Sequence, residues 1–244
     1  MDAISISAAS GMRARMESLE LLANNLANVE TGGFKADREF YSLYSSADAG
    51  EDPRNGQITT LPVIQSQWTD LRQGDLKTTG NPLDLAIDGE GFFSAQTPQG
   101  VRYTRNGNFR VSATGQLTTG EGHPVLSKQG TPVTIQQNLP VEITADGSVL
   151  QSGRPTTQLG VTAFDPGAVN KAGHNYFVAT PGATPKTTTA AIHQGTLETS
   201  NVGAPESAVR LVAIMRQFEM LQRAASVGNE LNKRAMEEIA RVTT

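Results

Sequence analysis

The sequence predicts an α+β protein in which helices at the two ends form a coiled-coil domain and an all-β domain is inserted between them. Apolar residues recur at helical spacing near both ends, whereas short alternating segments separated by turn residues fill the middle. We expect residues 1–35 and 204–244 to form the helical domain, residues 36–70 to form a linker or extended segment, and residues 71–203 to form the β-rich domain.

The C-terminal segment 206–242 carries a coiled-coil seam, because its apolar or small residues are spaced alternately three and four apart. These residues are Leu211, Ile214, Phe218, Leu221, Ala225, Ala235, Ile239 and Val242. Gly228 and Asn232 occupy the intervening positions, so the seam is weakest in its middle. A helix of this extent is about 54 Å long. A modest β-domain cannot cover such a stripe, and another helix must bury it.

The N-terminal segment 5–29 also has helical periodicity. Its apolar positions are Met12, Met16, Leu19, Leu22, Leu26 and Val29. Thr31-Gly32-Gly33 predicts the helix end, because glycine accepts the positive φ of a C-cap. Asn24, Asn25 and Asn28 cluster in the last two turns, although asparagine is a poor helix former. They mark either a fraying helix end or amides that bind neighbouring subunits.

The middle of the chain reads as short strands and turns. Residues 83–88, LDLAID, alternate in the manner of a half-buried strand. Asn106-Gly107 and Asp146-Gly147 each lie between apolar segments and predict hairpins with type I′ turns. The polar stretch 49–56 is expected to be an exposed loop or linker.

Composition narrows the class of protein. A net charge of −4 and a pI near 5.4 give no reason to expect a nucleic-acid partner. The absence of cysteine excludes disulfides and thiolate chemistry. The N-terminus has no basic residue before Arg13 and no continuous apolar run, so we expect neither a secretory signal peptide nor membrane insertion.

No pattern of catalytic or metal-binding residues emerges, and we expect no enzyme activity, metal or cofactor. His123, His174 and His193 stand far apart without metal-ligand spacing. One alternative is a β-rich carbohydrate-active enzyme with a coiled-coil tail, which would require a converging carboxylate pair. Its candidate carboxylates are Asp84, Asp88, Glu90 and Asp146. A cytoplasmic scaffold is a further alternative.

Five segments of the chain resemble, in the same order, the bacterial flagellar rod and hook proteins. They span both predicted helices and the β-rich middle, and therefore essentially the whole chain. The segments are NNLANVETGGFK at 24–35, GNPLDLAIDGEGFF at 80–93, YTRNGNFRV at 103–111, TGQLTTGEGHPVL at 114–126 and GTLETSNV at 195–202.

The resemblance implies a structural subunit of the flagellar basal-body rod, which spans the periplasm. In that family the terminal helices form an inner axial coiled coil and the β-region forms an outer domain. The implied partners are further copies of the chain, other rod proteins and the flagellar type III export apparatus, through which the unfolded chain would pass. The implied function is to polymerise through the helices and transmit motor torque.

The assembly contacts are expected on the apolar stripes and the asparagine cluster. The candidate residues are Leu19, Leu22, Asn24, Asn25, Leu26, Asn28, Val29, Leu211, Ile214, Phe218 and Leu221. The plainer interpretation is that the apolar members hold the subunit's own two helices together. Within the family, Arg216, Phe218, Glu219 and Met220 resemble the proximal-rod members more closely than the distal-rod members, which are the nearest alternative.

Overall fold

The computed structural model describes residues 3–45, 60–136 and 138–242, and it is an α+β protein. The chain divides into two compact units. The helical unit comprises Met1–Ala27, Asp37–Trp68 and Gly203–Thr244, and the strand-rich unit comprises Asn28–Ala36 and Thr69–Val202. None of the helices within the described ranges is long and apolar enough to cross a membrane.

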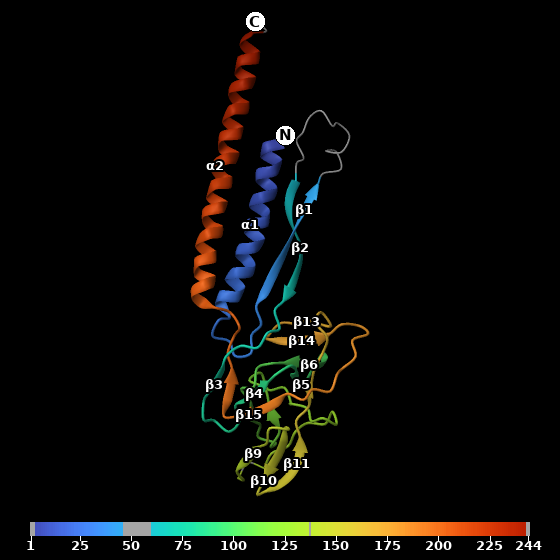
Figure 1. The fold of residues 1–244 in the computed structure, drawn as a ribbon. Coiled ribbons are helices and arrows are strands. Elements are labelled where there is room, and N and C mark those ends of the chain that lie inside the picture. The colour runs from blue at the N-terminus through green and yellow to red at the C-terminus, as the bar shows by residue number, and fades with distance from the viewer. Residues whose placement is uncertain (1–2, 46–59, 137, 243–244) are drawn as a thin grey trace. The chain divides into compact units, whose positions relative to one another are not determined.

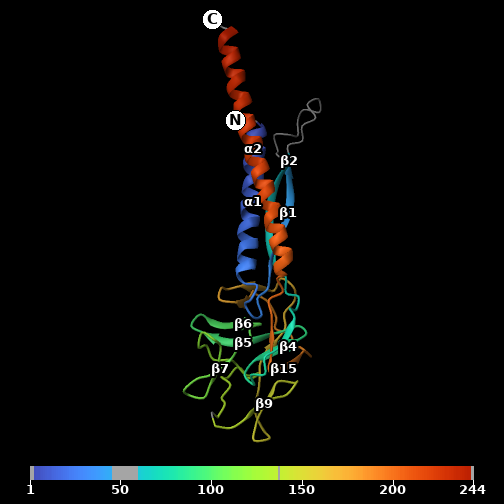
Figure 2. The same ribbon diagram turned by 90° about the vertical axis from the view of Figure 1, so that its left-hand side faces the viewer.

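The helical unit contains α1 (Ala3–Ala27) and α2 (Ala204–Val242), which lie side by side and run in opposite directions (Figures 1 and 2). Both predicted helices are confirmed, and each observed helix end lies within two residues of the predicted one. Proline at the first turn of α2 and Glu206 beside it suit a helix N-terminus, where an N–H is not needed and negative charge is favourable.

The two helices differ in length. α1 has 25 residues and α2 has 39. At 1.5 Å per residue, α2 is longer by about 21 Å. Both views show the C-terminal end of α2 projecting past the N-terminal end of α1 (Figures 1 and 2). The last turns of α2 therefore extend beyond the partner helix of their own chain.

A two-stranded sheet of β1 (Asp37–Ser45) and β2 (Thr60–Thr69) completes the helical unit. The side-chain amide of Asn25 on α1 donates to the Asp37 carbonyl at 2.8 Å and accepts from the Asp37 N–H at 2.9 Å. On α2, Arg210 forms an ion pair with Glu39 of β1. Strand β1 is thus tied to both helices. The polar stretch 49–56, expected to be a loop, lies outside the described residues.

In the described residues of the strand-rich unit, 14 strands are assigned, β3 to β16. Its strands are β3 (Leu76–Thr78), β4 (Leu85–Asp88), β5 (Phe92–Thr97), β6 (Gly100–Thr104), β7 (Arg110–Val111), β8 (Leu117–Thr118), β9 (Val141–Ile143), β10 (Ser148–Gln151), β11 (Arg154–Gln158), β12 (Val161–Thr162), β13 (Val169–Lys171), β14 (Tyr176–Ala179), β15 (Ala191–Gln194) and β16 (Thr196–Glu198). The largest sheet has the order β12-β5-β6-β14-β13, and a second has the order β11-β10-β9. β15 pairs with β4, β16 with β3 and β7 with β8.

Two apolar clusters fill this unit. The larger gathers buried residues from many strands: Leu85, Ile87, Phe93, Phe109, Leu117, Val125, Val133, Ile135, Ile143, Val149, Leu159 and Ile192. The smaller consists of Phe92, Phe164, Val169 and Phe177 and belongs to the five-stranded sheet. Strand β4 is buried at three successive positions, so its alternating sequence does not produce the half-exposed strand that we expected.

The two predicted hairpins have different outcomes. Asp146-Gly147 does connect paired strands, β9 and β10, but only Gly147 has a positive φ, at 83°, so the turn is not type I′. The hairpin at Asn106-Gly107 is wrong: β6 pairs with β5 and β14, and β7 pairs with β8. The Gly107 carbonyl instead accepts the Leu85 N–H at 3.0 Å, which directs the turn to β4.

Gly107 provides a test of this close backbone approach. A Cβ at Gly107 would lie 1.6 Å from the Leu85 carbonyl oxygen, whereas a Cβ at Gly120 would meet nothing within 4 Å. We expect Gly107→Ala to lower the free energy of unfolding of the strand-rich unit by on the order of 3 kcal/mol, and Gly120→Ala to change it by less than ~0.5 kcal/mol. Urea unfolding followed by circular dichroism measures both, and equal midpoints would contradict the packing described.

Candidate assembly interface

The contact between α1 and α2 uses a face of α1 that is rich in small residues. Gly11, Ala14 and Ser18 are buried, together with Leu22 and Asn25. A methyl group at Gly11 would lie 3.3 Å from Leu221 of α2, so the helices approach closely there. Ser18 satisfies its buried hydroxyl by donating to the Ala14 carbonyl at 3.0 Å.

The predicted assembly residues take three kinds of position. Leu22, Asn25 and Ile214 are buried. Leu19, Leu26, Asn28, Val29, Leu211, Phe218 and Leu221 are partly buried, and Asn24 is exposed. Of the asparagines, Asn25 binds the backbone of Asp37, and the Asn28 side chain accepts from the Thr31 hydroxyl at 3.2 Å. The α2 seam at Ile214 and Leu221 therefore faces inward, toward the subunit's own helix.

Helix α2 carries a second apolar stripe on its opposite side, which we name the outer stripe: Val209, Val212, Met220, Val227 and Leu231. Their side chains are 49–73% exposed. Together with Arg216 and Arg223, the positions of the outer stripe are spaced three or four residues apart. The sequence therefore contained this second helical pattern, but the more strongly apolar seam that includes Ile214 and Leu221 drew attention away from it. On α1, Met16 is 53% exposed and Met12, Leu19 and Leu26 are partly exposed.

A buried ionic cluster lies within the strand-rich unit. The Lys35 ammonium donates to Glu198 Oε1 at 2.5 Å and to the Arg72 carbonyl at 2.7 Å. Arg105 donates to Glu198 Oε2 at 3.0 Å. The side chains of Lys35 and Glu198 are fully buried. One carboxylate therefore contacts two buried cations.

Burial and the neighbouring charges together set the pKa of Lys35 in this cluster. Burial lowers the pKa of Lys35, because the charged form loses hydration, and Glu198 opposes that effect while Arg105 adds to it. The Arg105 guanidinium also donates to the Ile87 carbonyl at 3.2 Å and lies 5.5 Å from the centre of the Phe92 ring. Arg105 thus joins β4, β5 and Glu198.

Asn201 binds two separate backbone segments beside this cluster. Its amide nitrogen donates to the carbonyls of Asp70 at 2.7 Å and Arg72 at 3.0 Å. Its oxygen accepts the Ala36 N–H at 2.7 Å. Residues 34–36 thus group with the strand-rich unit, whereas from the sequence we expected residues 34 and 35 in the helical domain and residue 36 in the linker. Phe34 and Lys35 are buried there.

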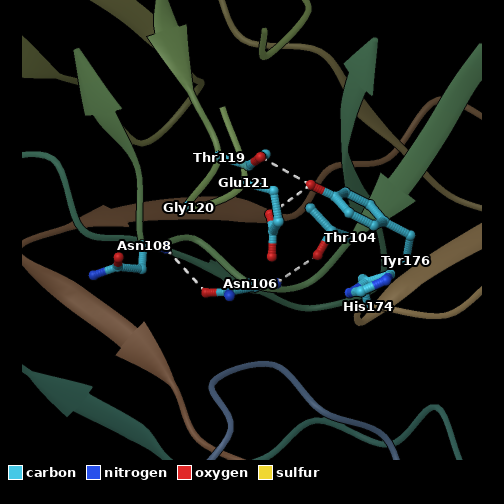
Figure 3. Close-up of a pocket in the computed structure, with 8 residues that line it drawn as sticks. All are labelled: Thr104, Asn106, Asn108, Thr119, Gly120, Glu121, His174 and Tyr176. Carbon is cyan, nitrogen blue, oxygen red and sulfur yellow. Dashed lines mark hydrogen bonds between the residues drawn. The ribbon is translucent and has the colours of Figure 1, made fainter. Parts of the chain in front are cut away.

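A shallow polar pocket lies elsewhere in the same unit (Figure 3). It is lined by Thr104, Asn106, Asn108, Thr119, Gly120, Glu121, His174 and Tyr176. The Tyr176 hydroxyl lies 2.8 Å from both Thr119 Oγ1 and Glu121 Oε2, and the close-up shows these groups converging. Burial raises the pKa of Tyr176, and the neighbouring Glu121 raises it further.

The carboxylates considered for an enzyme make separate local contacts. Asp84 accepts from Thr79, Asn81 and Asn108. Asp146 binds the hydroxyls of Thr144 and Ser148, and Asp88 lies 3.3 Å from His193. Within residues 3–45, 60–136 and 138–242, no three histidine or acidic side chains gather as metal ligands would.

An α+β subunit whose helices pair through one face and expose a second apolar face defines a structural protein suited to assembly. Three family models match the chain. They are Flagella basal body rod protein at residues 7–35, Flagellar hook protein FlgE/F/G D1 domain at 86–151, and Flagellar basal body rod FlgEFG protein C-terminal at 193–238.

Whole-chain relatives agree with these models. The chain is 33% identical to the flagellar basal-body rod protein FlgF of Caulobacter vibrioides, covering 92% of each chain. It is 34% identical to FlgF of Mesorhizobium japonicum, covering 93% of this chain and 95% of the relative. It is 30% identical to FlgG of Buchnera aphidicola, covering 91% and 94%. The chain therefore belongs to the flagellar basal-body rod protein family, as the resemblance implied.

Substitutions in the ionic cluster are expected to differ in how much they lower the free energy of unfolding. Glu198→Gln would remove the carboxylate that both buried cations contact, and we expect it to lower the free energy of unfolding by roughly 3–5 kcal/mol. Lys35→Met would leave Glu198 paired with Arg105, so the loss should be smaller, below ~2 kcal/mol. Denaturant unfolding measures both variants, with Glu142→Gln on the exposed edge of β9 as the control. Equal losses for Glu198→Gln and Lys35→Met would refute a shared carboxylate.

The hydrogen bonds of Glu121 in the pocket lead us to expect that the free energy of unfolding depends on pH. Burial alone would raise the pKa of Glu121, but hydrogen bonds, the first from the Tyr176 hydroxyl, hold this pKa below its ordinary value. The resulting stabilisation is present above the unfolded-state pKa, about 4.3, and is lost as the pH falls through the lower folded-state pKa. Stability measured from pH 7 to pH 2 should fall less steeply in Glu121→Gln than in the wild type. Tyr176→Phe should flatten the curve in the same way, and parallel curves would contradict the assignment.

Proposed function

We propose that this chain, a structural subunit of the flagellar basal-body rod, polymerises through its terminal helices and transmits torque through the repeated contacts. The observation that carries the proposal is the outer stripe of α2. Five large apolar side chains of one helix stand in solvent while the opposite face of that helix packs on α1. A regular apolar stripe of this kind favours contact with another helix.

The outer stripe and the exposed side of α1 suit one another as partners in neighbouring copies. The stripe of α2 is rich in valine and includes Arg216 and Arg223, whereas α1 offers Met12 and Met16 with Glu20 exposed nearby. Methionine adapts to irregular apolar surfaces, and the arginine and glutamate charges are complementary. Because the two surfaces differ, the contact is heterologous and repeats into a ring or an open helical polymer.

Torque transmission then rests on many modest contacts. Burying one large apolar side chain contributes roughly 1.5–3 kcal/mol, and every subunit in the polymer repeats the same set. The inner-seam residues Leu22, Ile214 and Leu221 serve in this proposal by holding the two helices of one subunit together. Asn24, which is exposed, is the asparagine best placed to bind a neighbouring copy.

The domain roles and partners follow the family resemblance. The helical unit would form the axial coiled coil and the strand-rich unit the outer all-β domain. Other rod proteins are the partners, and the flagellar type III export apparatus would deliver the chain. Arg216, Phe218, Glu219 and Met220 favour a FlgF-like proximal-rod subunit, with a FlgG-like distal-rod subunit as the alternative. Met220, one of these four residues, is 60% exposed and belongs to the outer stripe.

Substitution within the outer stripe tests the proposal. Val227 is 55% exposed and makes no part of the inner seam, so Val227→Asp should leave the monomer folded. In a polymer the carboxylate would be buried in an apolar contact, and we expect the association constant to fall at least tenfold. Gln222→Asp, an exposed position outside the stripe, is the matched control.

The measurements are sedimentation of the purified protein and electron microscopy of basal bodies from a strain carrying each variant. The expected result is shortened or missing rods with Val227→Asp and normal rods with Gln222→Asp. Circular dichroism must show equal helix content in both variants. Normal rods with Val227→Asp would refute the outer stripe as the polymer contact.

A further inference from the structure

Residues 191–201, which we name the closing segment, bind parts of the strand-rich unit that lie far earlier in the chain. β15 pairs Ile192 with Ile87, and β16 pairs Leu197 with Lys77. Glu198 meets Lys35 across 163 positions of sequence. Contacts at such separation close long loops, and the lost chain entropy is offset only after the contacts have formed.

The rest of the unit has a sheet that does not use the closing segment. The five strands β12-β5-β6-β14-β13 all lie between residues 92 and 179. Their own apolar cluster, Phe92, Phe164, Val169 and Phe177, contains no residue of the closing segment. All the strands of this sheet are therefore available once residue 179 is free, before the closing segment is present.

Strands β3 and β4 are in the opposite situation. In the part of the chain that the structure describes, β3 pairs with β16 alone and β4 pairs with β15 alone. Ile192 of β15 also belongs to the larger apolar cluster, which it shares with Leu85 and Ile87 of β4. Detaching the closing segment would leave both strands without a partner strand and would open one side of that cluster, while the Leu85 N–H of β4 would keep its bond to the Gly107 carbonyl.

Glu198 decides whether the closing segment can bind. Lys35 and Arg105 are 0% and 3% exposed, and both contact the Glu198 carboxylate. The same carboxylate accepts the Gly74 N–H at 3.0 Å, and the Glu198 carbonyl accepts the Gly33 N–H at 2.8 Å. A buried cation without a counter-charge is strongly unfavourable, so these side chains cannot stay inside until Glu198 arrives.

We propose that the closing segment is a latch: the five-stranded sheet folds first, and the unit closes over β3 and β4 when Glu198 meets Lys35 and Arg105. A chain that becomes available from its N-terminus stays open in this region until residue 201 is free. The inference concerns the folding of one subunit and does not depend on the polymer contacts proposed above.

Native-state amide exchange on the full chain tests the latch region by region. In the wild type, amides of β3, β4, β15 and β16 should exchange through one shared opening that costs less free energy than the opening that exposes β5, β6 and β14, so the first set should exchange at least about tenfold faster. In Glu198→Gln, the first set should lose its protection while β5, β6 and β14 stay protected. Glu142→Gln, the exposed control on β9, should change neither set. Equal exchange rates for the two sets in the wild type, or joint loss of protection by both sets in Glu198→Gln, would overturn the proposal, because a unit without a separate latch opens as a whole.

A milder variant covers the case in which Glu198→Gln does not fold. Ile192→Val removes one buried methylene from β15, and it should speed exchange of β3, β4, β15 and β16 roughly two- to tenfold while these four strands remain the first to exchange. Pulse-labelled refolding of the wild type gives a kinetic check: β5, β6 and β14 should become protected before β15 and β16. Simultaneous protection of all these strands would also overturn the latch.

Discussion

Two buried cations, Lys35 and Arg105, share the carboxylate of Glu198, and this interaction constrains how the strand-rich unit folds. Lys35, Arg105 and Glu198 come from three distant parts of the sequence, and burial of the two cations depends on the carboxylate that both of them contact. The contacts among these three side chains fix the position of the segment after α1 within the strand-rich unit. They also hold β4 and fix the position of the segment that precedes α2. Asn201 extends this order to the backbones of Ala36 and Asp70 by hydrogen bonds alone.

Helix α2 faces a different constraint, because it is apolar on two sides while its own chain supplies one partner. The small residues of α1 allow close approach on one side, and the other side remains in solvent. In the function proposed above, the stability of the subunit and its contact with other copies depend on opposite faces of one helix. This division lets substitutions affect assembly without unfolding the subunit.

Sequence periodicity was sufficient to predict both helices and the strand-and-turn character of the middle, because these depend on local spacing. It could not tell which face of α1 packs on α2: Met16 fits the apolar pattern but is exposed, whereas Ser18 does not fit it and is buried. Nor could local reasoning pair Lys35 with Glu198, since their contact depends on the tertiary fold. At Gly107, contact with Leu85 overrode the turn type that the dipeptide favours by itself.

The unequal lengths of the two helices give the subunit a polarity. α2 outreaches α1 at one end only, so each copy has a projecting tip and an opposite end without one (Figure 1). If copies repeat one heterologous contact, as proposed above, they all point the same way, whereas reversing one copy would place tip against tip. A filament of such subunits would have chemically distinct ends and a preferred direction of growth.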